Sequence, residues 1–110
     1  MKHIKLIKQF ELETGHGQDG DKSVSLLFDG TFRKLVEVRL QNSAILSRHH
    51  ADVPITVYCV SGNGVFSAGE DLEDTQVLKA GTLITLETGV EHEVLAEPDL
   101  HILVTKFLAN

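Results

Sequence analysis

The chain has no tryptophan, one cysteine and two prolines. Cys59 has no second thiol to pair with, so packing rather than a disulfide must hold the fold, and we expect a reducing, cytoplasmic location. No apolar run approaches the roughly 18 residues that a membrane span requires. Charged residues interrupt the first 13 residues too often for a signal peptide. We therefore expect no membrane insertion.

Basic residues are also scarce. Ten Lys and Arg against 16 Asp and Glu give a formal net charge of −6. Nucleic-acid binding needs clustered basic side chains, and none is visible, so we expect no nucleic-acid partner. The 110 residues are 42% hydrophobic and 24% charged, which is ordinary for a single globular domain. We expect one domain over residues 1–110.

Short alternating segments separated by turn residues dominate the chain. Residues 33–40 show the pattern well, since Val36, Val38 and Leu40 alternate with charged residues. Turns are expected at 29–30, 41–43, 62–64, 69–71 and 80–81, and no segment has the pattern of an amphipathic helix. The pattern predicts an all-β sandwich or small barrel of about ten strands: residues 3–10 (or a lead-in), 23–28, 33–40, the segment holding His49 and His50, 55–60, 65–67, 75–78, 83–86, 93–95 and 100–107.

Two of these segments carry histidine next to a glycine turn. Residues 46–66 contain His49 and His50, then an apolar run and a glycine turn; residues 81–96 contain a strand, Gly89 and His92. The first has the length of the cupin motif H-x-H, spacer, Glu, six residues, Gly. The second matches the other cupin motif, Gly, five residues, Pro-x-Gly, two residues, His, except at the proline. The chain thus resembles a small single-domain, RmlC-like cupin, which implies a double-stranded β-helix jelly-roll barrel.

The resemblance also implies a metal site, which this sequence only half retains. In metal-binding cupins, two histidines and a glutamate of the first motif join the histidine of the second motif. Those places hold His49, Ala51, Ile55 and His92 here, so two ligands are missing. A divalent ion (Zn, Ni, Fe or Mn) held by His49 and His92 is one hypothesis, with His50 as the alternative to His49.

A pocket inside the barrel is the more general expectation. Because side chains alternate along a strand, only one of His49 and His50 should face inward. We favour the register that places His49 inside, which puts these residues around one pocket: His49, Ala51, Ile55, Val57, Cys59 and His92.

Three functions remain open at this point. The barrel could bind an apolar or carboxylated small molecule without strong metal chemistry, or be a metal-dependent cupin enzyme of the dioxygenase or isomerase type with an unidentified third ligand. It could also be a structural subunit with a vestigial pocket. A jelly roll of this size has sheet edges to protect, so we expect a two-fold homodimer in which N-terminal strands extend the neighbouring sheet.

Overall fold

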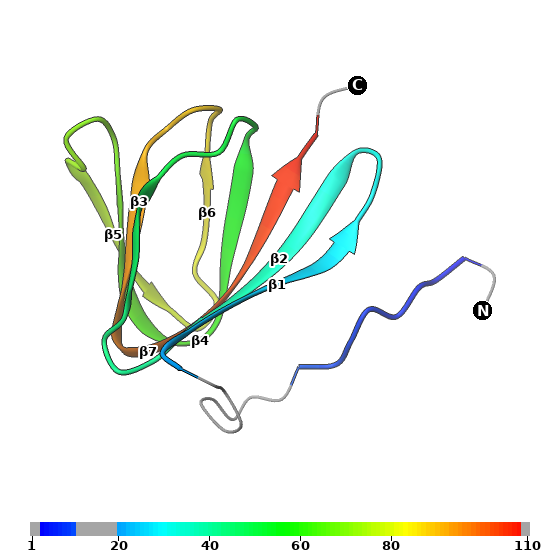
Figure 1. Ribbon diagram of the computed structural model, residues 1–110, viewed down its shortest axis with the longest axis horizontal. Helices are drawn as coiled ribbons and strands as arrows, with labels where there is room; N and C mark the ends of the chain where they lie inside the picture. The colour runs from blue at the N-terminus through cyan, green and yellow to red at the C-terminus, as the bar shows by residue number, and fades with distance from the viewer. Residues whose placement is uncertain (1–2, 11–19, 109–110) are drawn as a thin grey trace.

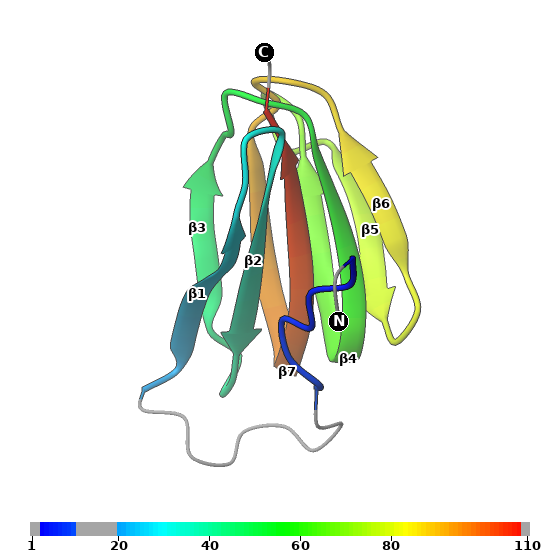
Figure 2. The ribbon, with the colours of Figure 1, turned by 90° about the vertical axis from the view of Figure 1, so that its right-hand side faces the viewer.

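A computed structural model describes residues 3–10 and 20–108 of the chain. Its strands are antiparallel, and the described residues contain no helix. Figures 1 and 2 show them folded into two facing layers. The predicted all-β jelly-roll fold is therefore confirmed. The strands are β1 (Lys22–Asp29), β2 (Arg33–Leu40), β3 (Ile45–His49), β4 (Ile55–Ala68), β5 (Asp74–Lys79), β6 (Leu83–Leu86) and β7 (His92–Phe107).

Two long strands, β4 and β7, join the layers. The first half of β4 pairs with β6 and with the second half of β7. That half of β7 pairs with β2, and β2 pairs with β1. This gives a five-stranded layer. The second half of β4 pairs with β5 and with the first half of β7, which pairs with β3. The four-stranded layer is thus continuous with the other one through β4 and β7.

The bend that turns one layer into the other lies at the glycines of β4. The β4–β7 register shifts between Cys59 and Ser61 and again between Gly62 and Gly64. Gly62 has φ of +86°, a left-handed conformation that glycine adopts without steric strain. The turn predicted at residues 62–64 is therefore wrong, because the chain does not reverse there. It bends within a strand of 14 residues, as β-bulges allow.

The number of strands is corrected for the same reason. Segments 55–60 and 65–67 are one strand, β4, and segments 93–95 and 100–107 are one strand, β7. Residues 3–10 form no strand in the structure. The turns at 41–43, 69–71 and 80–81 lie between strands as predicted, and the turn at 29–30 begins at the last residue of β1. Strand alternation then places one apolar side of each layer inward. The buried core comprises Val38, Leu40, Ile55, Val57, Cys59, Phe66, Leu78, Leu86, Val94, Ala96, Leu100 and Ile102.

The outer side of the five-stranded layer holds a buried polar cluster. His101 is fully buried, and its Nε2 donates a hydrogen bond to Glu37 Oε2 at 2.7 Å. Lys8 of the N-terminal segment pairs with the same carboxylate at 3.0 Å, and Arg39 lies 3.5 Å from it. The Phe10 ring packs edge-on against His101 with centroids 5.4 Å apart. Residues 3–10, which we call the arm, are thus anchored to this layer through Lys8 and Phe10.

Candidate functional site

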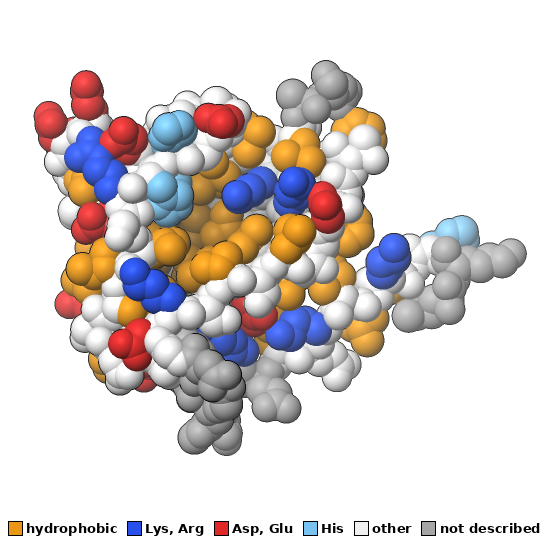
Figure 3. Space-filling view, viewed as in Figure 1, with side chains coloured by type: hydrophobic (Ala, Val, Ile, Leu, Met, Phe, Trp, Pro, Cys, Tyr) orange, Lys and Arg blue, Asp and Glu red, His pale blue; other side chains and the backbone are white. Residues whose placement is uncertain are grey.

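An open cavity of about 160 Å³ lies between the two layers. Figure 3 shows it as an apolar hollow with histidines on one rim and basic side chains across from them. None of the described residues that line it is acidic. The lining comprises Val24, Val36, Val38, Leu46, His49, His50, Ala51, Ile55, Val57, Phe66, His92, Val94, Ile102, Val104 and Lys106.

His49 and His92 meet at the mouth of this cavity. His49 ends β3 and His92 begins β7, and the two residues are direct partners in the antiparallel pairing. Their rings make an edge-on contact with centroids 4.2 Å apart. The Phe66 ring stacks on the other side of His92 at 5.3 Å. Two segments far apart in sequence therefore bring their histidines together. Five of the six predicted pocket residues line one cavity: His49, Ala51, Ile55, Val57 and His92.

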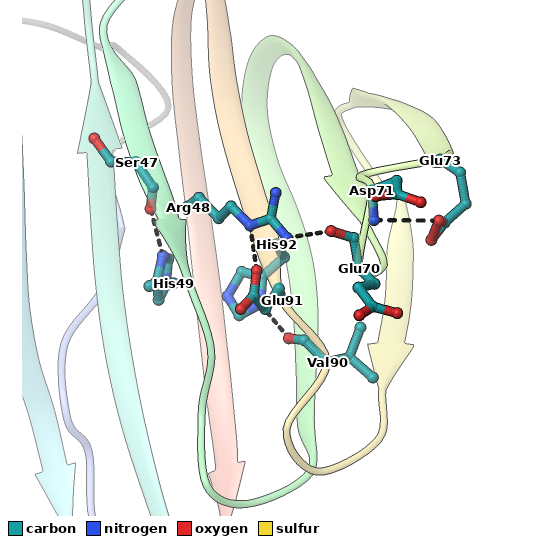
Figure 4. Close-up of polar contacts among 9 residues, drawn as sticks. All are labelled: Ser47, Arg48, His49, Glu70, Asp71, Glu73, Val90, Glu91 and His92. Carbon is teal, nitrogen blue, oxygen red and sulfur yellow. Dashed lines mark hydrogen bonds and ion pairs between the residues drawn. The ribbon is translucent and has the colours of Figure 1, made fainter.

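Hydrogen bonds place a hydrogen on Nδ1 of both rings. His49 Nδ1 lies 2.7 Å from Ser47 O, and His92 Nδ1 lies 3.0 Å from Val90 O (Figure 4). A carbonyl oxygen only accepts, so each Nδ1 carries a hydrogen, and Nε2 is the ring nitrogen left to contact a ligand. Burial lowers the pKa of His92 most, and the neighbouring His49, His50 and Lys106 act in the same direction. His92 is therefore neutral near pH 7 and offers Nε2 as an acceptor or base.

His50 also lines the cavity, contrary to the prediction that His49 and His50 point to opposite sides. Strict alternation holds only within a strand, and β3 ends at His49. His50 begins the loop after it and is free of the pleat. Its Nε2 lies 3.4 Å from the exposed Asp52 carboxylate. All three histidines therefore border the same opening.

Cys59 does not line the cavity, although Val57 does. Cys59 is fully buried in the core, and its Sγ lies 3.5 Å from Ser61 O. It stands beside the register shift at the bend, where the two layers converge and core side chains fill the space between them. Burial raises the pKa of this thiol, which makes it a packing residue rather than a nucleophile.

Lys106 is the basic lining residue that the sequence interpretation missed. It is the only lysine or arginine among the lining residues, it is half-buried, and it lies directly opposite Ile55 in the β4–β7 pairing. The available signal was the alternation of Ile102, Val104 and Lys106 on one face of the last strand. The opposite face of this strand, which holds His101, is about equally apolar in sequence. Alternation alone therefore did not show which of the two faces points into the barrel.

Behind the histidine pair, Arg48 fastens β3 to the loops around it. Its guanidinium donates hydrogen bonds to the Glu91 carboxylate and to the backbone carbonyl of Glu70 (Figure 4). Arg48 precedes His49 and Glu91 precedes His92, so the ion pair joins the two strands next to the paired histidines. Arg48 is absent from the lining of the cavity.

The donor set does not fit the metal centre that the resemblance implies. Two imidazoles face each other, but no carboxylate or thiolate lines the cavity. Over residues 3–10 and 20–108, no three His, Cys, Asp or Glu side chains are grouped so that they could share an ion. Catalytic metal sites usually supply three protein ligands. A divalent ion at His49 and His92 stays a prediction.

Comparisons with solved structures agree with this architecture. An RmlC-like cupin protein from Desulfovibrio desulfuricans superposes with a TM-score of 0.76 at 21% identity, over 94% of this chain and 95% of that chain. A cupin superfamily protein from Desulfitobacterium hafniense gives 0.75 at 7% identity, over 86% and 84%. KdgF from a Halomonas species gives 0.71 at 16% identity, over 84% and 86%.

These similarities define the class of the protein: the chain has the fold of a small cupin domain. At such low identities they carry the fold and not the activity. No protein-family model matches the chain, and no curated protein matches it by sequence. No helix in the described part of the chain is long and apolar enough to cross a bilayer.

Proposed function

We propose that the protein binds a small carboxylate with an apolar body in the cavity between its two layers. The observation that carries this proposal is Lys106, a single ammonium in a wall that is otherwise aliphatic, aromatic or imidazole. No described acidic side chain lies within ion-pair distance of it, so a ligand anion can take that place. A charge in apolar surroundings is stabilised by a partner of opposite sign.

The histidines add a second recognition element. With hydrogen on Nδ1, the neutral His92 presents a lone pair on Nε2. It therefore accepts a hydrogen bond from the ligand rather than donating one. A hydroxyl or N–H group beside the carboxylate would satisfy it, and the neutral His92 could take a proton from that group.

The size of the cavity limits the apolar part. A cavity of about 160 Å³ is close to the engineered cavity of about 150 Å³ that holds one benzene molecule. The ligand body is therefore one ring or a short branched alkyl chain, packed against Val57, Val94 and Ile102. The carboxylate then lies toward Lys106 and the donor group toward the histidines.

Thermal denaturation with benzoate, 2-hydroxybenzoate and methyl benzoate tests the proposal. Both acids should raise Tm, the hydroxy acid more, and the ester should not, because binding to the folded state stabilises it. Lys106→Met should abolish the shift. Lys34→Met is the matched control, since Lys34 is the cross-strand neighbour of Lys106 but pairs with Asp29 at 3.7 Å. Equal shifts in Lys106→Met and the parent would contradict the proposal.

A metal-dependent enzyme is the alternative, favoured by the 4.2 Å separation of the two imidazole rings. It predicts that nickel or zinc raises the Tm of untagged protein and that His49→Ala and His92→Ala each remove the effect. In the carboxylate proposal, His92→Ala removes only the advantage of 2-hydroxybenzoate over benzoate, and metal has no effect. The same set of melts therefore distinguishes the two.

A further inference from the structure

A second cavity, of about 360 Å³, opens between β5 and β6, and we call it the side cavity. Both strands flank β4 on the side of the molecule away from β1 and β2 (Figure 2), but β5 pairs with the second half of β4 and β6 with its first half. Because β4 bends between these halves, β5 and β6 lie in different layers and leave a space between them. The lining of the side cavity comprises Phe66, Ala68, Asp74, Thr75, Gln76, Ile84, Thr85, Leu86, Glu87 and Val90.

The inward side of β5 has an unusual polarity. Leu78 is fully buried in the core, and Asp74 and Gln76 precede it at the alternate positions that share its side of the strand. Gln76 lies directly opposite the buried Phe66 in the β4–β5 pairing, so both side chains are on the same side. Val77, on the outer side, is 62% exposed. An antiparallel sheet normally places apolar residues inward and polar residues outward. Packing of the core therefore does not account for the order of residues in β5.

The polar groups of the side cavity are suited to accept hydrogen bonds. Asp74 begins β5 and Glu87 follows the end of β6, so the two carboxylates come from opposite walls. None of the lining residues is basic. No lysine, arginine or histidine in the described part of the chain forms an ion pair with either carboxylate. Gln76 Nε2 already donates to Val77 O at 3.0 Å, which leaves the amide oxygen of Gln76 as a further acceptor. These acceptors match a positively charged group with several N–H donors.

Apolar side chains form the floor of the side cavity. Phe66 and Leu86 are 3% and 9% exposed, and Ile84 and Val90 are partly buried against the same core. The volume of about 360 Å³ is more than twice the 160 Å³ of the first cavity. An engineered cavity of about 150 Å³ holds one benzene molecule. A ligand body of two fused rings with a short chain therefore matches the side cavity in size.

We propose that the side cavity is a second binding site, which takes an organic cation with an apolar body, such as a primary amine on an aromatic ring system. The ammonium group lies between Asp74 and Glu87, because charge-assisted hydrogen bonds to carboxylates are among the strongest in proteins. The rings pack on Phe66 and Leu86. The first cavity has a lysine and no described acid, whereas the side cavity has two acids and no described base. The two cavities therefore select ligands of opposite charge.

Fluorescence anisotropy of tryptamine tests the proposal on the parent protein. The chain has no tryptophan, so indole emission excited beyond the absorption of tyrosine comes from the ligand alone. The anisotropy should rise as protein is added, and high salt should weaken this binding because it screens the carboxylates. Tryptophol, which has a hydroxyl in place of the ammonium group, should bind more weakly and without this dependence on salt. Equal binding of tryptamine and tryptophol would overturn the proposal without any variant.

Three substitutions locate the binding site. Asp74→Asn and Glu87→Gln should each raise the dissociation constant of tryptamine at least about threefold, within the range for one exposed ion pair. Asp71→Asn is the matched control, since it removes the same charge from the exposed loop before β5 and lies outside the lining. It should leave the dissociation constant unchanged. An equal effect of all three substitutions would show attraction to the net charge of −6 only, which would contradict a site at Asp74 and Glu87.

Two other outcomes also contradict the side cavity as the site of the amine. If tryptamine binds in the first cavity, Lys106→Met should raise its affinity, because a repelling cation is removed from the wall. Inward charges also protect strand edges from pairing with other chains. If Asp74 has that role alone, Asp74→Asn should aggregate and tryptamine should not bind the parent protein.

Discussion

Replacing Gly62 with alanine should destabilise the fold more than replacing Gly81 with alanine. A Cβ at this position would stand 2.2 Å from the backbone oxygen of Asp99 and 2.9 Å from Leu100 Cα. These are backbone atoms of β7, so no side-chain rotation relieves the contact. Gly62 also has φ of +86°. The layers of the barrel are joined here, so β7 must move for the substitution to fit.

The magnitude has two separable parts. The left-handed conformation costs alanine about 1–2 kcal/mol. Overpacking against an immobile neighbour typically adds about 1–3 kcal/mol. Gly81→Ala isolates the first part, because Gly81 has φ of +93° and a Cβ there meets nothing within 4 Å. The expected loss is therefore about 1–2 kcal/mol for Gly81→Ala and about 2–5 kcal/mol for Gly62→Ala.

Urea denaturation at one fixed protein concentration, followed by circular dichroism, measures both losses. The cavity adds a second readout, since displacing β7 moves Ile102, Val104 and Lys106 together. Gly62→Ala should also weaken the benzoate-induced shift in Tm, and Gly81→Ala should not. A Gly62→Ala variant that is no less stable than Gly81→Ala would contradict the inference that β4 and β7 approach closely at the bend.

Two further predictions concern titration and metal affinity. The pKa of Glu37 is lowered despite its burial, through Lys8 and His101, and burial lowers the pKa of His101. Each group thus stabilises the fold above its unfolded pKa, which is near 4.5 for Glu37 and near 6.5 for His101. This contribution is lost as the pH falls through the folded pKa. Urea midpoints should therefore fall from pH 7 to pH 4, and the fall between pH 6.5 and 5 should be smaller in His101→Gln, whereas an unchanged slope would contradict this assignment. Ile55→Glu should raise the nickel affinity, measured by calorimetry, because it adds a carboxylate to the cavity of His92. Combining Ile55→Glu with Lys106→Met should raise this affinity further, because Lys106 lies opposite residue 55. A double variant that binds nickel no better than the parent would show that residue 55 does not share a site with the histidines.

The sequence was sufficient where a strand is regular. Alternation placed Ile55 and Val57 inward, and the motif spacing paired His49 with His92 across β3 and β7. Each of these inferences depends on local periodicity or on the length of a turn. They hold because the segments containing them are uninterrupted between a turn and the residue in question.

The errors occurred where the pleat is broken. His50 follows the end of β3, so alternation no longer governs its direction. Cys59 is in phase with Val57, but the bend beside it brings the layers together and fills the space that a lining residue needs. Gly62 and Gly64 read as a chain reversal, although they only bend β4. The shape of a bulge depends on the partner strand, which a single sequence does not specify.

The electrostatics of the pocket bears both on the absent metal-ligating side chains and on the proposed carboxylate ligand. Lys106 lies close enough to His92 to lower the pKa of that ring, after burial and the other two histidines have done so. The same positive potential opposes a divalent cation more strongly than a single proton, since the interaction scales with charge. It favours an anion for the same reason. With Ala51 and Ile55 at the places where metal-binding cupins hold His and Glu, the cavity lacks a carboxylate and a third imidazole at these places and has a cation, Lys106, in its wall. A chain with these residues is better suited to bind a carboxylate directly than through a metal ion.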